Sequence, residues 1–141
     1  MILQKILLTI CCLATLMVTN AQNWYSVGNT QFTPSLAANL TFEFGNSDTP
    51  FVAYTVSGGG HKASVMKYNG TSWVNVGSSN FSAGTANDLS LAMDTNKVPY
   101  VAYIDMSNGT KPTVKKFNGN SWDTIGNQGF APFGLTIYHL H

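Results

Sequence analysis

Apolar and polar residues alternate over short stretches of this chain, as they do in β-strands that bury one face. One such stretch has apolar residues at every second position, Leu89, Leu91 and Met93. Turn-forming residues follow at 94–97, and after them an almost continuous apolar run at 100–104 favours a strand that is covered on both faces. The pattern therefore predicts short strands joined by tight turns.

The same order of elements is predicted twice, as two units of four antiparallel strands. The expected strands are 40–44, 51–56, 64–68 and 73–76 in the first unit, and 89–93, 100–104, 113–117 and 122–125 in the second. Third and fourth strands are joined at Asn69-Gly70 and at Asn118-Gly119. Both pairs predict a type I′ hairpin turn, because Asn and Gly tolerate positive φ.

The two units are copies of each other with a period of 49 residues. The segment 69–73 returns as 118–122, and 16 of 49 positions are identical when 32–80 is aligned with 81–129. Asn23 and Trp24 stand at the same phase before the first unit. We therefore divide 22–141 into four segments, by analogy with tandem repeat proteins. These are a lone outer strand at 22–31 (strand 24–27), repeat 1 at 32–80, repeat 2 at 81–129 and a truncated repeat 3 at 130–141.

The repeated segments also resemble a known family. Tyr/Phe-Val-Ala-Tyr, at 51–54 and 100–103, and Tyr/Phe-Asn-Gly-x-Ser-Trp, at 68–73 and 117–122, are similar to the repeats of secreted bacterial β-propeller-type proteins. The period is similar to that of kelch blades, and the Asn-Gly-x-Ser-Trp turn resembles the Asp-box turn of sialidase-like propellers. The resemblance implies an all-β fold of tandem four-stranded antiparallel propeller blades in an incomplete ring, with two full repeats and a partial third. It also implies an N-terminal fragment, since the smallest usual ring has four blades.

The first 21 residues predict an export signal. Lys5 precedes an apolar run at 6–18 that is too short to span a bilayer comfortably, and small or short residues before position 22 fit cleavage after Ala21. A retained membrane anchor is the alternative. Cleavage would remove Cys11 and Cys12, the two cysteines of the chain, and would leave a secreted or cell-surface protein without disulfides and without a membrane segment.

Charge excludes several kinds of partner. Only 9% of the residues are charged, and all seven basic residues are Lys. Arg supplies the planar fork that reads phosphates and base edges, so its absence argues against nucleic-acid binding. Without Lys5 the chain has six basic and six acidic residues. A neutral surface predicts no general attraction to membranes or polyanions.

Catalytic chemistry has little support in the sequence. No acidic residue recurs at the same phase of the repeat; the six are Glu43, Asp48, Asp88, Asp94, Asp105 and Asp123. No pair of them is marked as a glycosidase acid and nucleophile, and scattered solvated charge is the simpler interpretation. Glu43 points away from Phe42 and Phe44 on a first strand, where it would line a water-filled channel.

Other candidate motifs are also weak. His139 and His141 have the spacing of a metal pair on a strand, but we interpret them as an unstructured tail. The glycine run at 58–60 lacks the Lys of a phosphate loop. The repeated aromatic residues could stack on sugars, but packing between units is favoured; they are Tyr54, Tyr103, Trp73 and Trp122. We therefore predict no catalytic residue, no metal and no cofactor.

A ligand is expected at one edge of the sheets. Antiparallel order puts the loops between second and third strands on the same side as the connection between one unit and the next. The residues expected there are His61, Lys62, Asn87, Asp88, Asp105, Asn108 and Lys111. Loops on a fixed scaffold commonly carry specificity.

The sequence therefore favours a secreted, non-catalytic scaffold for extracellular binding or adhesion, with a protein or a glycan as partner. Two alternatives stay open: a truncated sialidase-like glycoside hydrolase, and a truncated gene product without a function of its own. Two repeats would leave faces partly uncovered at Phe42, Phe44, Tyr54, Leu91 and Tyr103. Copies of the chain could then complete the ring as a homo-oligomer, or the chain would aggregate.

Overall fold

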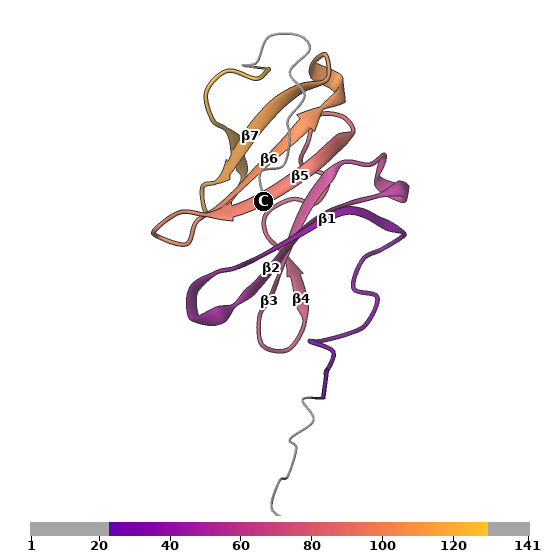
Figure 1. Cartoon of the computed structure of the whole chain (residues 1–141), viewed down its shortest axis with the longest axis vertical. Coiled ribbons are helices and arrows are strands. Elements are labelled where there is room, and N and C mark those ends of the chain that lie inside the picture. Colours follow the sequence, from indigo (N-terminus) through magenta and orange to yellow (C-terminus); the bar gives the residue numbers. More distant parts are fainter. Residues whose placement is uncertain (1–22, 130–141) are drawn as a thin grey trace, which may run out of the picture.

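The computed structural model describes residues 23–129, which form two four-stranded antiparallel sheets (Figure 1). The first sheet has the order β1-β2-β3-β4, with β1 (Ala37–Phe44), β2 (Pro50–Val56), β3 (Ala63–Tyr68) and β4 (Trp73–Asn75). The second has the order β5-β6-β7-β8, with β5 (Ala86–Met93), β6 (Pro99–Asp105), β7 (Lys111–Phe117) and β8 (Trp122–Thr124). Single 3-10 turns lie at η1 (Asn46–Asp48), η2 (Ser57–Gly59) and η3 (Met106–Asn108). The predicted all-β class is confirmed, while the described residues form no closed ring.

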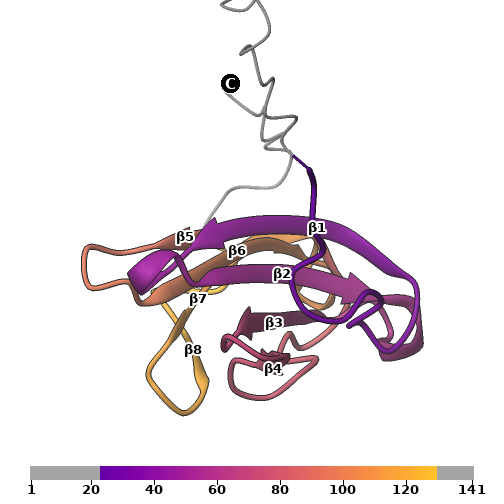
Figure 2. The same cartoon turned by 90° about the horizontal axis from the view of Figure 1, so that it is seen from below.

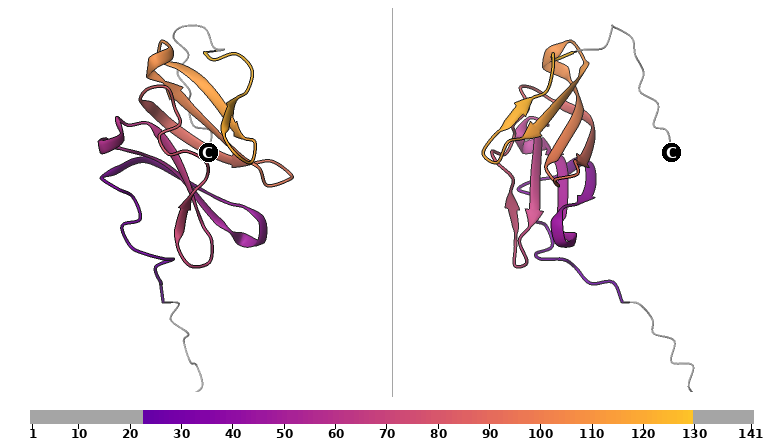
Figure 3. Two further views of the ribbon diagram at one scale, coloured as in Figure 1. Left: turned by 180° about the vertical axis from the view of Figure 1, so that it is seen from behind. Right: turned by 90° about the vertical axis from the view of Figure 1, so that its left-hand side faces the viewer.

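The two sheets lie one after the other along the long axis of the molecule (Figures 1 and 3). They run in the same sense, with β1 and β5 together at one side and β4 and β8 at the opposite side (Figure 2). β5 contacts both β1 and β2 across the junction. Consecutive repeats are thus joined through their first strands. Within 23–129 no helix has the length or the apolar character needed to span a bilayer.

The first strand of each sheet is longer than predicted and contains a β-bulge. The register shifts between Ala38 and Thr41 in β1 and between Asn87 and Ser90 in β5. The residues at these shifts, Asn39 and Asp88, have φ of 48° and 51°. Among residues other than Gly, Asn and Asp are those that best tolerate this left-handed conformation. Each bulge adds an unpaired residue to the first strand, and the alternation of inward and outward side chains resumes after it.

The hairpins between third and fourth strands differ from the prediction. Tyr68 pairs with Trp73, so the loop has four residues rather than two. The Asn69 side-chain oxygen accepts hydrogen bonds of 2.9 Å from the backbone N–H groups of Thr71 and Ser72, and only Gly70 has positive φ (95°). The type I′ assignment was therefore wrong, because the Asn acts through its side chain rather than through its backbone conformation.

The strand expected at 24–27 is not formed, and no strand precedes β1 in the described range. Trp24 is fully exposed. A strand needs a hydrogen-bonding neighbour, and this segment has none within residues 23–129. The export signal predicted at 1–21 and the partial repeat predicted at 130–141 lie outside the described residues.

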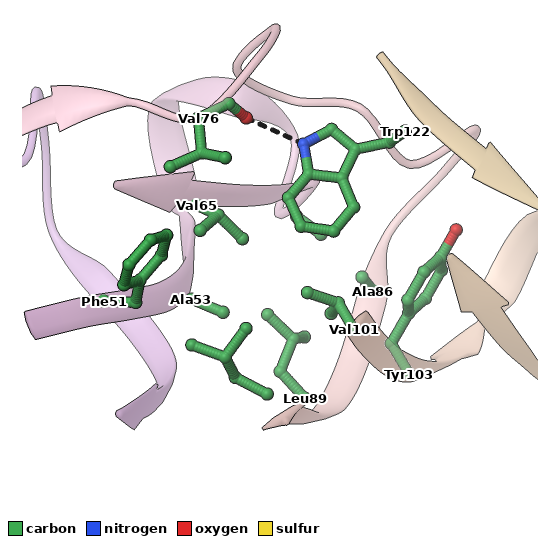
Figure 4. Packing of buried hydrophobic residues seen from close by; sticks show 11 residues of the cluster. Phe51, Ala53, Val65, Val76, Ala86, Leu89, Val101, Tyr103 and Trp122 are labelled. Atoms are coloured by element: carbon green, nitrogen blue, oxygen red, sulfur yellow. Dashed lines mark hydrogen bonds between the residues drawn. The ribbon is translucent and has the colours of Figure 1, made fainter. Parts of the chain in front are cut away.

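A tryptophan on each fourth strand docks onto the segment that enters its repeat. The Trp122 indole N–H donates a 2.8 Å hydrogen bond to the Val76 carbonyl oxygen (Figure 4). The Trp122 ring also stacks on Phe81, with 4.5 Å between the ring centroids. Trp73 does the same with the Val27 carbonyl at 2.9 Å and with Phe32 at 4.5 Å. The 49-residue period is thus the spacing of a recurring tertiary contact.

The core lies between the two repeats (Figure 4). It joins one face of the first sheet to the opposite face of the second; its buried members are Phe51, Ala53, Ala63, Val65, Val76, Ala86, Leu89, Leu91, Val101, Tyr103 and Trp122. Each large apolar side chain in such a core stabilises the fold by roughly 1.5–3 kcal/mol. Of the repeated aromatic residues, Tyr103 and Trp122 pack in this core, as the sequence indicated. Tyr54 and Trp73 pack instead in a separate cluster of the first repeat. Tyr54, Leu91 and Tyr103 are buried, so the expectation that they are partly uncovered was wrong.

Candidate functional site

The edge predicted to bind a ligand is assembled from both repeats. The Ala86 N–H donates a 2.9 Å hydrogen bond to the His61 carbonyl, and the Thr85 hydroxyl donates to the Gly60 carbonyl at 3.2 Å. The β2–β3 loop of repeat 1 therefore lies against the start of β5. His61 is exposed and Lys62 is half-buried at this junction.

The second repeat adds a buried carboxylate to the same edge. Asp105, at the end of β6, is cross-strand to Ala86 on one side and to Lys111 on the other. One of its oxygens accepts hydrogen bonds from the Ser107 N–H at 3.0 Å and the Ser107 hydroxyl at 2.6 Å, which caps η3. Asn87, next to Ala86, is half-buried beside it.

Four buried polar atoms in this part of repeat 2 have no hydrogen-bond partner among the described residues: Tyr103 OH, Asp105 Oδ2, Asn108 Nδ2 and Thr113 Oγ1. Tyr103 and Thr113 are cross-strand neighbours. Burial, and secondarily the charge of Asp105, raises the pKa of the Tyr103 hydroxyl. At the same phase repeat 1 has Val56 in place of Asp105, so the buried carboxylate is specific to repeat 2. Such atoms are ordinarily satisfied by water or by a small polar group.

The seven predicted residues do not converge on one point. Asp105, Asn108, Lys111 and Asn87 lie around the end of β6, and His61 with Lys62 lies across the repeat junction. Asp88 is exposed on the β5 bulge, where its role is conformational. No group of three metal-ligating side chains occurs among residues 23–129.

A large concavity lies on the other edge, between the two sheets. This hollow, here called the lysine groove, has a volume of about 770 Å³. It is lined by Asn46, Thr49, Phe51, Lys67, Val76, Lys97, Val98, Pro99, Lys116, Phe117, Asn118 and Gly119. Three lysines and several amide and hydroxyl groups surround an apolar floor, and no carboxylate is among these lining residues.

The three lysines come from different elements. Lys67 on β3 and Lys116 on β7 occupy the same phase of the repeat, and Lys97 follows β5 in the next turn. The Lys116 ammonium lies 3.9 Å from an Asp94 oxygen and 5.1 Å from the centre of the Tyr100 ring. Tyr100 first, and Asp94 to a lesser extent, raises the pKa of Lys116. Lys116 is therefore a fixed positive charge at the rim.

Several carboxylates of the described region accept hydrogen bonds from groups close to them in the sequence. One Asp94 oxygen accepts from the N–H groups of Asn96 and Val98 at 2.8 and 2.9 Å, which closes the β5–β6 turn. Asp123 accepts from the Asn118 side chain at 2.7 Å. Glu43 accepts from the backbone N–H of its own neighbour at 3.0 Å. These contacts are structural.

Sequence reasoning missed the lysine groove. It concentrated on residues that differ between the repeats, whereas Lys67 and Lys116 are identical at the same phase. That recurrence was the available signal. The chain matches no protein-family model, no curated protein and no solved structure, so its function is inferred here from the geometry alone.

Proposed function

We propose that the chain is part of a secreted, propeller-type repeat scaffold that binds an anionic ligand in the lysine groove without catalysis. The ligand is an acidic carbohydrate or an acidic protein segment. Each sheet acts as one blade, and the recurring tryptophan contact between successive repeats supports this interpretation. Secretion rests on the composition of the first 21 residues.

The observation that carries the proposal is the charge of the groove. Three ammonium groups line one hollow, and the lining residues include no acid. Asp94 already offsets part of the charge of Lys116, whereas Lys67 and Lys97 make no ion pair within residues 23–129. An anion in the groove would pair with these ammonium groups. The apolar floor at Phe51, Val76 and Phe117 lowers the local dielectric constant and strengthens the attraction.

Binding is favoured over catalysis because no acidic side chain is among the residues that line the groove. Asp94, Asp105 and Asp123 hold turns or caps, and none of them lines the groove. A glycosidase needs two free carboxyl groups that face each other across its substrate. The groove instead offers fixed cations and neutral hydrogen-bonding groups such as Asn46 and Thr49, which suit recognition.

Calorimetric titration of the full chain tests the proposal. An oligomer of uronic-acid sugars and an oligoglutamate peptide are the two anionic probes, and a neutral oligosaccharide is the reference. We expect an anionic probe to bind and its affinity to fall with added salt. Lys67→Gln, Lys97→Gln and Lys116→Gln should each weaken binding by up to about fivefold, since exposed charge pairs contribute roughly 0.2–1 kcal/mol.

The matched control is Lys62→Gln, which removes the same charge at the opposite edge and should leave the affinity unchanged. Failure of both anionic probes to bind would contradict the proposal. Binding that responds to His61→Ala or Asn108→Ala, and not to the three groove variants, would move the site to the edge predicted from the sequence.

A further inference from the structure

The two repeats bury the same positions to very different extents. Leu89, Leu91 and Met93 of β5 pack into the core between the repeats. Their counterparts on β1 are Leu40, Phe42 and Phe44, and all three are exposed. Phe42 is 47% exposed, while Leu91 at the same phase is 5% exposed. Repeat 1 therefore exposes the face with which repeat 2 is docked, and no other part of residues 23–129 covers it. We call these three residues the leading face.

The opposite half of the interface is also present twice. Repeat 1 contributes Phe51, Ala53, Ala63, Val65 and Val76 to the shared core, and all are buried. Their counterparts in repeat 2, here called the trailing face, are Tyr100, Ala102, Pro112, Val114 and Ile125; none is buried. Accordingly β2 is buried continuously, whereas β6 alternates buried and half-buried residues.

We propose that the leading face of one copy of this chain docks onto the trailing face of a second copy. This contact would reproduce between two molecules the contact seen between the two repeats. The chain already contains one example of this interface, and the residues at the corresponding positions of both free faces are also apolar. Because the two faces are different surfaces, the association is head-to-tail and adds copies in one direction. The inference is independent of the anionic ligand.

One segment must give way when the copies meet. In the contact between the repeats, Val76 fills one position at the interface. Val27 of the incoming copy and Ile125 of the receiving copy both correspond to Val76 in the repeat, so only one of them can fill the same position between two copies. Ile125 is 45% exposed where Val76 is 5% exposed. Displacing the segment around Ile125 therefore exposes little buried surface. The incoming copy keeps its own hydrogen bond between the Trp73 indole N–H and the Val27 carbonyl.

Two charge variants of the full chain test the proposal by complementation. Phe42→Glu places a charge on the leading face, and Ala102→Glu places one on the trailing face. We expect the unmodified chain to self-associate with rising concentration in light scattering, and each variant alone to be a monomer. An equimolar mixture of the two should form a dimer, because each variant retains the face that the other needs.

The matched control is Met106→Glu, which charges an equally exposed apolar side chain (46%) on η3. Its counterpart in repeat 1, Ser57, is not part of the core between the repeats, so this variant should associate as the unmodified chain does. Circular dichroism establishes that each variant is folded. A monomeric unmodified chain, or variants that still associate singly, would overturn the proposal. Ala102→Glu associating alone while Phe42→Glu does not would indicate a symmetric contact between leading faces and would overturn it as well.

Discussion

The Trp122 indole N–H and the Val76 carbonyl oxygen are 2.8 Å apart although 46 residues separate them, and the bond crosses the junction between the repeats. Trp73 and Val27 make the same bond at the same separation, at the outer side of repeat 1. The two contacts differ in burial: Trp122 is buried between two sheets, whereas Trp73 is half-buried. This difference allows the contribution of the junction to be measured.

Removing the junction tryptophan should be the more costly of the two changes. Trp122→Ala leaves a cavity and an unpaired Val76 carbonyl, so we expect a loss of about 3–5 kcal/mol in the free energy of unfolding. Trp73→Ala should cost clearly less. Urea denaturation followed by circular dichroism measures both, with Trp24→Ala as a control at a fully exposed position. Equal losses at Trp73 and Trp122 would show that the junction is not specially stabilising.

Substitutions at Gly77 and Gly126, which have the same backbone conformation, can distinguish the cost of backbone strain from the cost of a steric clash. Gly77 (φ 71°) lies against repeat 2, where an added Cβ would be 2.9 Å from a Phe117 ring carbon. Gly126 (φ 66°) has nothing within 4 Å of such a Cβ. Gly126→Ala should cost about 1–2 kcal/mol from the left-handed conformation alone. Gly77→Ala should cost more, since it adds a clash; a smaller loss there in thermal denaturation would contradict the tight fit.

High pH should destabilise the fold through its buried tyrosines. Burial raises the pKa of Tyr54 and of Tyr103 above the ordinary value of 10.0. Above that pH the unfolded chain loses tyrosine protons that the folded chain retains, so the folded state binds more protons and stability falls as pH rises. The limiting slope is about 1.4 kcal/mol per pH unit for each tyrosine. The contribution is fully present below pH 10.

Denaturant midpoints measured across the alkaline range test this expectation. Tyr103→Phe should flatten the decline, because it removes one of the two retained protons. Absorbance titration of tyrosinate in the folded chain should show two groups that ionise only as the protein unfolds. If every tyrosine of the native protein ionised near pH 10, the assigned burial of Tyr54 and Tyr103 would be incorrect.

The four-residue hairpins should depend on the side chain of their asparagine. Asn118 accepts from the N–H groups of Asn120 and Ser121 at 2.9 and 2.8 Å. Asn118→Ala should cost about 1 kcal/mol, by analogy with the loss of a helix N-cap. Asn118→Asp keeps the acceptor oxygen and should recover much of this, offset by repulsion from Asp123. Asn118→Gly, which favours a positive-φ turn instead, should not rescue stability in denaturant titrations.

The sequence by itself determined the all-β class, the 49-residue period and the approximate position of eight strands. These properties are local: alternation reports a half-buried strand, and identical residues at one spacing report a repeated structural unit. Strand ends and turn types were less well predicted. The bulges at Asn39 and Asp88 and the side-chain turn at Asn69 depend on which backbone groups are left unpaired once the strands have joined.

Tertiary structure alone decided which surfaces are free. Phe42 and Leu91 occupy the same phase and look alike in the sequence, yet one is exposed and the other buried, because only the second has a neighbouring sheet. The lysine groove likewise exists only where Lys97 of one repeat comes beside Lys67 of the other. A repeated sequence specifies what each unit can bury, and the order of units in space determines what each unit does bury.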